Sequence, residues 1–215
     1  SKKVITIYSP SFDKSIIKKS REKLNLSRRF KYIINVSRFS KEKDLSTTLK
    51  AFKLVLNKIK NLKLILIGYG PELKKIKLLA KELNIHNKIL IINKSQNPYK
   101  YIRRSELLVL SSIYEGFPNV LNEALTIGRP VISTNSNSGA SEILLNGKGG
   151  DLVKVKDYKN LSKKIIDHFK FPKKLQKKTI FAQKKLYRFE TKRHCKIYTN
   201  LFKNIWWKLL LLVLD

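Results

Sequence analysis

Two glutamates flank a short segment that is suited to bind an anion. Glu115 and Glu123 stand at the two ends of the sequence Glu-Gly-Phe-Pro-Asn-Val-Leu-Asn-Glu. Pro118 fits the first turn of a helix, where the N–H that proline lacks would have no partner in any case. Such a helix leaves outward amides unpaired, and together with the helix dipole they favour an anion such as phosphate. These amides belong to Asn119, Val120 and Leu121.

The carboxylates beside these amides predict hydroxyl ligands. An ionised carboxylate only accepts hydrogen bonds, so Glu115 and Glu123 would bind phosphate poorly and hydroxyl groups well. Phosphate and hydroxyl groups together indicate a nucleotide sugar. The plainer alternative is that Glu115 is a solvated loop residue and that Glu123 only favours the N-terminal half of a helix.

Apolar runs on either side place this segment at the edge of a parallel sheet. Short buried strands are expected at 107–110 and 131–133, and Gly128 suits the position just past the intervening helix. Open α/β folds bind ligands where such loops leave the carboxyl ends of the strands. The predicted fold is α/β, a Rossmann-like doubly wound sheet of about six parallel strands with helices on both faces. Further strands are expected at 31–36, 62–67, 88–92 and 151–155, and helices at 44–59, 72–83, 158–169 and 175–186.

Composition limits the classes of partner. The chain has 215 residues and a net charge of +32, but its lysines are scattered over nearly every segment. A nucleic-acid site would concentrate them on one face with aromatic residues between them, so no specific nucleic-acid partner is expected. An anionic membrane surface remains a candidate partner. The single cysteine, Cys195, excludes internal disulfides and fits a reducing cytoplasm.

The C-terminal residues 206–214, Trp-Trp-Lys-Leu-Leu-Leu-Leu-Val-Leu, form an apolar run of their own. The run is shorter than the roughly 20 residues needed to span a bilayer. It could dock on another domain, touch a membrane interface through its paired tryptophans, or remain a tail.

The segment from Glu115 resembles a known signature. Glu-Gly-Phe-Pro-Asn-Val-Leu-Asn-Glu-Ala-Leu, then Gly-Arg-Pro-Val-Ile-Ser-Thr and Ser-Gly-Ala-Ser-Glu-Ile, is similar to the E-x7-E region of retaining GT-B glycosyltransferases of family 4. The resemblance runs from about Val4 to about Phe202. It implies the C-terminal, donor-binding half of such an enzyme, with the N-terminal acceptor domain absent. Residues 1–28 are then a linker remnant, 29–186 the nucleotide-sugar-binding domain, and 187–215 a helix and apolar tail crossing back toward the missing domain.

The same resemblance implies roles for two cations. Ser-Arg38-Phe and Glu-Lys43-Asp resemble the Gly-Arg-Leu and Glu-Lys-Gly elements of the family, with Ser37 and Asp44 in place of glycines. Arg38 and Lys43 would then hold the diphosphate of the donor and neutralise it as it leaves, which is a catalytic role. Without the resemblance they are two solvated cations among 47.

Other donor-binding roles follow from the resemblance. Gly-Tyr-Gly70-Pro is similar to a family turn beside the nucleotide, so Gly70 would let the backbone approach a ligand. The loop that starts at Asn93 corresponds to one that reads the base, although relatives usually have glycine there. Glu123 would accept hydrogen bonds from the ribose, and Glu115 would face the sugar and the reacting centre.

The implied activity is retaining, metal-independent transfer from a nucleotide-diphosphate sugar, with a UDP-sugar expected. The acceptor would be a glycan or a lipid-linked molecule in cell-surface polysaccharide synthesis, in the cytoplasm or peripherally at the inner membrane face. No cofactor or metal ion is expected, since no Asp-x-Asp motif occurs. This half alone is expected to bind nucleotide weakly and to transfer nothing. The alternatives are a basic non-enzymatic module that binds membrane or nucleic acid, and a domain like a sugar-nucleotide epimerase.

Overall fold

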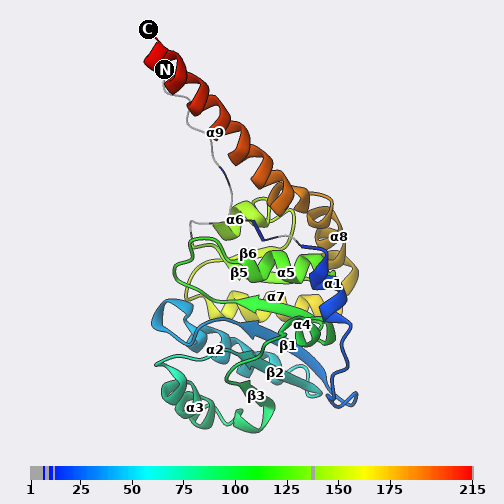
Figure 1. The fold of residues 1–215 in the computed structure, drawn as a ribbon. Coiled ribbons are helices and arrows are strands. Elements are labelled where there is room, and N and C mark those ends of the chain that lie inside the picture. Colours follow the sequence, from blue (N-terminus) through cyan, green and yellow to red (C-terminus); the bar gives the residue numbers. More distant parts are fainter. Residues whose placement is uncertain (1–6, 8–9, 12, 137–138, 215) are drawn as a thin grey trace.

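The computed structural model describes residues 7, 10–11, 13–136 and 139–214. Six parallel strands form one sheet in the order β3-β2-β1-β4-β5-β6 (Figure 1). This confirms the predicted doubly wound α/β fold. The strands are β1 (Lys31–Val36), β2 (Leu62–Ile67), β3 (Ile89–Ile92), β4 (Leu107–Leu110), β5 (Val131–Thr134) and β6 (Asp151–Val153).

Helices cover both faces of the sheet, which explains why its central strands are mostly apolar. Neighbouring residues of β1 point to opposite faces, with Ile33 in one core cluster and Ile34 in the other. The first cluster lies under α2 (Leu45–Leu56), α3 (Leu73–Glu82) and α7 (Tyr158–Lys170). The second lies under α4 (Tyr99–Arg104), α5 (Asn119–Ile127) and α6 (Gly139–Ile143).

The strand order reverses direction between β1 and β4. The chain moves outward from β1 through β2 to β3, then returns to place β4 on the other side of β1. Ile33 therefore pairs with Leu64 on one side and with Leu107 on the other. Loops that leave two adjacent strands in opposite directions open a crevice, and ligands of this fold class bind there.

Two helix ends depend on residues that tolerate unusual backbone angles. Asp44 lies in the left-handed region (φ 41°), and its side chain caps α2 by accepting from the amide of Thr47. Gly128 ends α5 in the same region (φ 84°), which confirms the predicted stop. α5 begins at Asn119, so Pro118 precedes the first turn instead of belonging to it.

The remaining helices extend the fold at both ends of the chain. They are α1 (Ser15–Ser20), α8 (Pro172–Gln183) and α9 (Thr191–Leu214), with short 3-10 turns η1 (Lys41–Lys43), η2 (His86–Lys88) and η3 (Leu186–Phe189). α1 packs against α4 and α5. α9 projects away from the rest of the protein (Figure 1). In the described part of the chain, no helix is long and apolar enough to cross a membrane.

Candidate active site

The loops that follow β1 and β4 bring together two of the predicted site residues. Lys43 Nζ lies 2.7 Å from Glu115 Oε2. The hydroxyl of Ser112 donates to the other oxygen, Glu115 Oε1, at 2.6 Å. Glu115 is only 9% exposed, so it is not the solvated loop residue of the plainer alternative. A buried carboxylate with one cationic and one neutral partner is therefore fixed at the switch between the strands.

Hydrogen bonds hold the loop that carries Lys43 against the end of β4. The amide of Ile113 donates to the carbonyl of Glu42 at 2.8 Å. The hydroxyl of Ser111 donates to the carbonyl of Asp44 at 2.7 Å, and Thr48 donates to that hydroxyl at 2.8 Å. These contacts fix the backbone on both sides of Lys43. The ion pair with Glu115 is thus built on rigid elements.

Arg38 and Asn93 line a common hollow of about 320 Å³ at the carboxyl ends of β1, β2 and β3. Arg38 is exposed, and Tyr69 and Pro98 complete two sides of the hollow. The pKa of the nearby Glu42 carboxyl is lowered, first by a hydrogen bond from Ser40 and to a smaller extent by the charges of Lys43 and Arg38. Lys43 and Arg38 therefore both affect the charge of Glu42, although only Arg38 lines this hollow.

The turn after β2 uses its glycines to approach protein backbone. A Cβ atom on Gly68 (φ 155°) would lie 1.8 Å from the carbonyl oxygen of Ser37. One on Gly70 (φ 151°) would lie 2.4 Å from the carbonyl oxygen of Phe39. Gly68 lines the hollow beside Arg38, and Gly70 is not among its lining residues. The close approach at Gly70 is to the loop after β1, and its contact with a ligand stays a prediction.

Glu123 and Asn119 lie in a second hollow, of about 220 Å³. Burial raises the pKa of the Glu123 carboxyl, and a hydrogen bond with Tyr99 opposes that shift. Pro98 lines the first hollow and Tyr99 the second, but the two hollows share no lining residue. Glu123 therefore lies in a different hollow from Arg38, and it does not share the Lys43 contact.

The start of α5 differs in one respect from the prediction. The amide of Leu121 is not free, because it donates to the carbonyl of Pro118 at 3.0 Å. The first turn is tightened in the 3-10 manner that is common at helix ends, and this satisfies the third amide. The predicted role of Leu121 as a free donor is therefore wrong. Among the described residues, the amides of Asn119 and Val120 have no hydrogen-bond partner.

Sequence reasoning did not identify Ser112 and Tyr99 as members of this region. The pair Ser111-Ser112 directly after an apolar strand was a usable signal, because polar side chains at that point face the crevice. Tyr99 carried no such signal, since its contact with Glu123 depends on the packing of α4 against α5.

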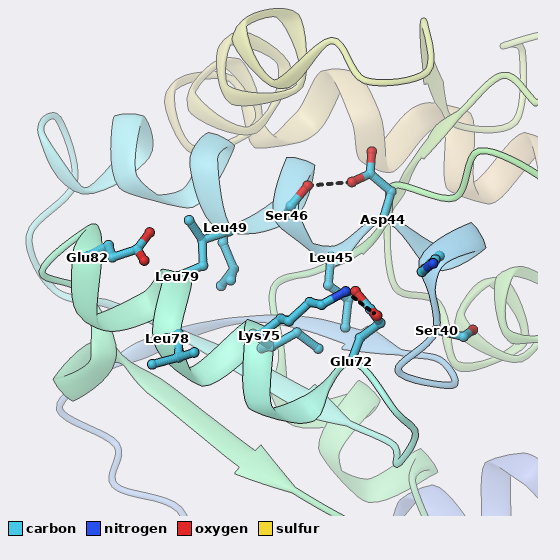
Figure 2. Close-up of a pocket in the computed structure, with 12 residues that line it drawn as sticks. Ser40, Asp44, Leu45, Ser46, Leu49, Glu72, Lys75, Leu78, Leu79 and Glu82 are labelled. Atoms are coloured by element: carbon cyan, nitrogen blue, oxygen red, sulfur yellow. Dashed lines mark hydrogen bonds and ion pairs between the residues drawn. The ribbon is translucent and has the colours of Figure 1, made fainter.

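A further hollow, of about 450 Å³, lies between α2 and α3 (Figure 2). Its floor is apolar, with Leu45, Leu49 and Leu79, and an ion pair joins Lys75 to Glu72 at 3.0 Å on its rim. None of the predicted site residues lines it. Within the described residues, no group of three or more His, Cys, Asp or Glu side chains could hold a metal ion.

Comparison with known proteins gives a family. Residues 16–185 match the family model described as glycosyl transferases group 1. N-acetyl-alpha-D-glucosaminyl L-malate synthase of Bacillus anthracis is 30% identical over 174 residues, which cover 79% of this chain and 45% of that protein. N-acetylgalactosamine-N,N'-diacetylbacillosaminyl-diphospho-undecaprenol 4-alpha-N-acetylgalactosaminyltransferase of Campylobacter jejuni is 35% identical over 125 residues, which cover 58% of this chain and 33% of that protein.

Solved structures agree on the fold. The Anabaena protein HepE in complex with UDP-glucose superposes with a TM-score of 0.77 at 20% identity, covering 92% of this chain and 56% of that one. The chain thus spans about half or less of each protein compared, and at this identity the structural likeness concerns the fold alone. The family match covers most of the chain, and the parallel sheet has the matching architecture. The chain therefore belongs to the glycosyl transferases group 1, and its fold is that of the GT-B glycosyltransferases.

Proposed function

We propose that this chain is the C-terminal, donor-binding half of a retaining family 4 glycosyltransferase that uses a UDP-sugar without a metal ion. The observation that carries the proposal is the contact between Lys43 and Glu115 across the switch between β1 and β4. The contact supports the proposal because a cation suited to a phosphate then lies next to a carboxylate suited to accept from a sugar hydroxyl. The UDP-glucose bound by HepE supports a uridine nucleotide as the donor.

The cations and the start of α5 would act on the leaving group. In the proposed reaction the bond from the anomeric carbon to the diphosphate oxygen breaks, a bond to an acceptor hydroxyl oxygen forms, and the proton of that hydroxyl passes to the departing diphosphate. Negative charge grows on the diphosphate, and donors that are already in place stabilise it most. Arg38 and Lys43 take this role, with the free amides of Asn119 and Val120 as further donors. Because these groups supply the positive charge, no metal ion is required.

The carboxylates would orient the rest of the donor. Glu115, held by Ser112, accepts from a hydroxyl of the transferred sugar next to the reacting bond. Glu123 accepts from the ribose, and the base occupies the hollow lined by Asn93. Gly70 would let the turn after β2 pack closely on the backbone of Phe39, next to the loop that carries Arg38.

The acceptor would bind to a part of the protein outside this chain. A glycan or lipid-linked acceptor is proposed, which the undecaprenol-linked substrate in the name of the Campylobacter jejuni relative supports. The proposed location is the cytoplasm, at the inner membrane face. There the net charge of +32 favours peripheral contact with anionic lipid, since each Lys or Arg near such a surface contributes about 1 kcal/mol.

Titration calorimetry with UDP tests the proposal. We expect the wild-type chain to bind UDP weakly, and Arg38→Ala and Lys43→Ala to lose detectable binding. Lys75→Ala is the matched control, because Lys75 is also paired with a glutamate but lies in the hollow between α2 and α3. A folded wild-type chain that binds no UDP at millimolar concentration would contradict the proposal.

A further inference from the structure

We propose that Tyr99 is a positioning residue that orients the Glu123 carboxylate to accept a nucleotide hydroxyl. This inference rests on the proposed function and adds a residue to the donor site. Tyr99 and Glu123 line the same hollow of about 220 Å³, one from α4 and the other from α5. The two helices pack directly against each other.

The backbone of Tyr99 is anchored before its side chain reaches the hollow. Tyr99 is the first residue of α4, and its amide donates to the side-chain oxygen of Asn97 at 3.1 Å. The side-chain nitrogen of Asn97 donates in turn to the carbonyl of Lys19 at 2.9 Å. The start of α4 is therefore tied to the end of α1. A half-buried ring on an anchored residue has few orientations, so its hydroxyl is held at one place.

The hydrogen bond between Tyr99 and Glu123 acts on both the orientation and the charge of the carboxylate. A carboxylate offers about four acceptor positions, so one bond from the phenol restricts its rotation and leaves other positions open to a ligand. A hydroxyl ligand needs the ionised form as its acceptor. Burial raises the pKa of Glu123 and thus disfavours that form, whereas the bond with Tyr99 lowers it again.

The hollow also contains two other charged side chains. Asp13 and Lys19 line it from the N-terminal side. The pKa of Asp13 is lowered, chiefly by hydrogen bonds from Ser15, so its carboxylate already has a partner. Burial, and after it the charges of Glu123 and Asp13, raise the pKa of Tyr99. The phenol therefore stays protonated at neutral pH and remains a donor to the carboxylate.

The substitution Tyr99→Phe removes the hydroxyl and keeps the ring. By calorimetry at pH 7 we expect the affinity for UDP to fall about two- to tenfold, the usual effect of having to order one side chain on binding. UDP binding should weaken at low pH, where Glu123 becomes protonated. In Tyr99→Phe this weakening should begin at a higher pH, because Glu123 lacks the bond that favours its ionised form. Tyr101→Phe is the matched control on the same helix and should change neither quantity. In a Glu123→Gln background, Tyr99→Phe should have little further effect.

The possible outcomes distinguish failure of the inference from failure of the proposed function. If the wild type binds UDP and Tyr99→Phe binds it with the same affinity and pH profile, the inference is overturned and the proposed function stands. If the wild type binds no UDP, both are overturned. A carbon-13 NMR titration of the Glu123 carboxyl in the unliganded protein, assigned with Glu123→Gln, reads the contact without nucleotide. We expect a higher pKa in Tyr99→Phe, and an unchanged pKa would overturn the inference on its own.

Discussion

The ion pair of Lys43 and Glu115 allows a prediction of stability that is independent of any ligand. Replacing Lys43 with Ala leaves a carboxylate that is 9% exposed with Ser112 as its remaining partner. Breaking a fully buried pair typically costs about 3–5 kcal/mol, and breaking an exposed pair about 0–1 kcal/mol. The side chains of the pair are 19% and 10% exposed. After a reduction for solvent screening, we expect Lys43→Ala to lower the free energy of unfolding by about 2 kcal/mol.

A double-mutant cycle separates this pair from general effects of substitution. Urea denaturation would be measured for Lys43→Ala, Glu115→Gln and the double variant, and we expect a coupling free energy of about 1–2 kcal/mol. The control cycle uses Lys75 and Glu72, whose side chains are 67% and 21% exposed. That pair spans one turn at a helix start and should couple by less than about 0.5 kcal/mol. If the two cycles give equal couplings, the view of Lys43 and Glu115 as a preformed part of the site is refuted.

Three further predictions concern single residues. Burial raises the pKa of Glu123, so this carboxyl binds a proton more tightly in the folded protein than in the unfolded protein. The stability that Glu123 contributes is therefore full at low pH and is lost as the pH rises through the folded-state pKa. Glu123→Gln should therefore raise the melting temperature at neutral pH while it weakens UDP binding, and an unchanged melting temperature would contradict this. Gly68→Ala should lower the free energy of unfolding by about 3 kcal/mol or more, since its Cβ would lie 1.8 Å from a carbonyl oxygen. Gly116→Ala, which meets nothing within 4 Å, is the control and should change stability by less than about 0.5 kcal/mol in urea denaturation. Asp44→Ala should lower the free energy of unfolding by about 2 kcal/mol, because the helix cap is lost and alanine is strained in the left-handed region. Asp44→Gly should lower it by roughly 0.5 kcal/mol at most, because glycine is not strained there. Equal losses in the two variants would exclude backbone strain as a cause.

Most of the fold could be predicted from the sequence. The expected strands agree with β1, β2, β3, β4 and β5 to within one residue at each end, whereas β6 ends at Val153, two residues before the expected end. α8 begins earlier than expected, at Pro172, because proline in the first turn starts a helix that the apolar spacing alone places at 175. The segment at 206–214 continues α9, whereas its residue pattern was equally consistent with docking, membrane contact or an unstructured tail.

The sequence predicted which residues belong to the candidate site better than it predicted the contacts between them. The residue types at Glu115 and Glu123 and the neighbouring helix start indicated hydroxyl and phosphate ligands. The free amide expected at Leu121 was wrong, because whether a helix opens with an α or a 3-10 turn depends on how its first turn packs. The hollows beside Arg38 and Glu123 could not be predicted either, since each is lined by several elements that are distant in sequence.

The sequence by itself determined the order of strands and helices, the helix end at Gly128, and the family signature. These depend on local backbone preferences and on the spacing of apolar residues, which each segment carries within itself. Only the tertiary structure decided that Lys43 contacts Glu115, 72 positions further along the chain, and that Tyr99 contacts Glu123. Those contacts exist because β4 packs beside β1 and α5 beside α4. That arrangement is selected by burial of the whole core and is not encoded in any single segment.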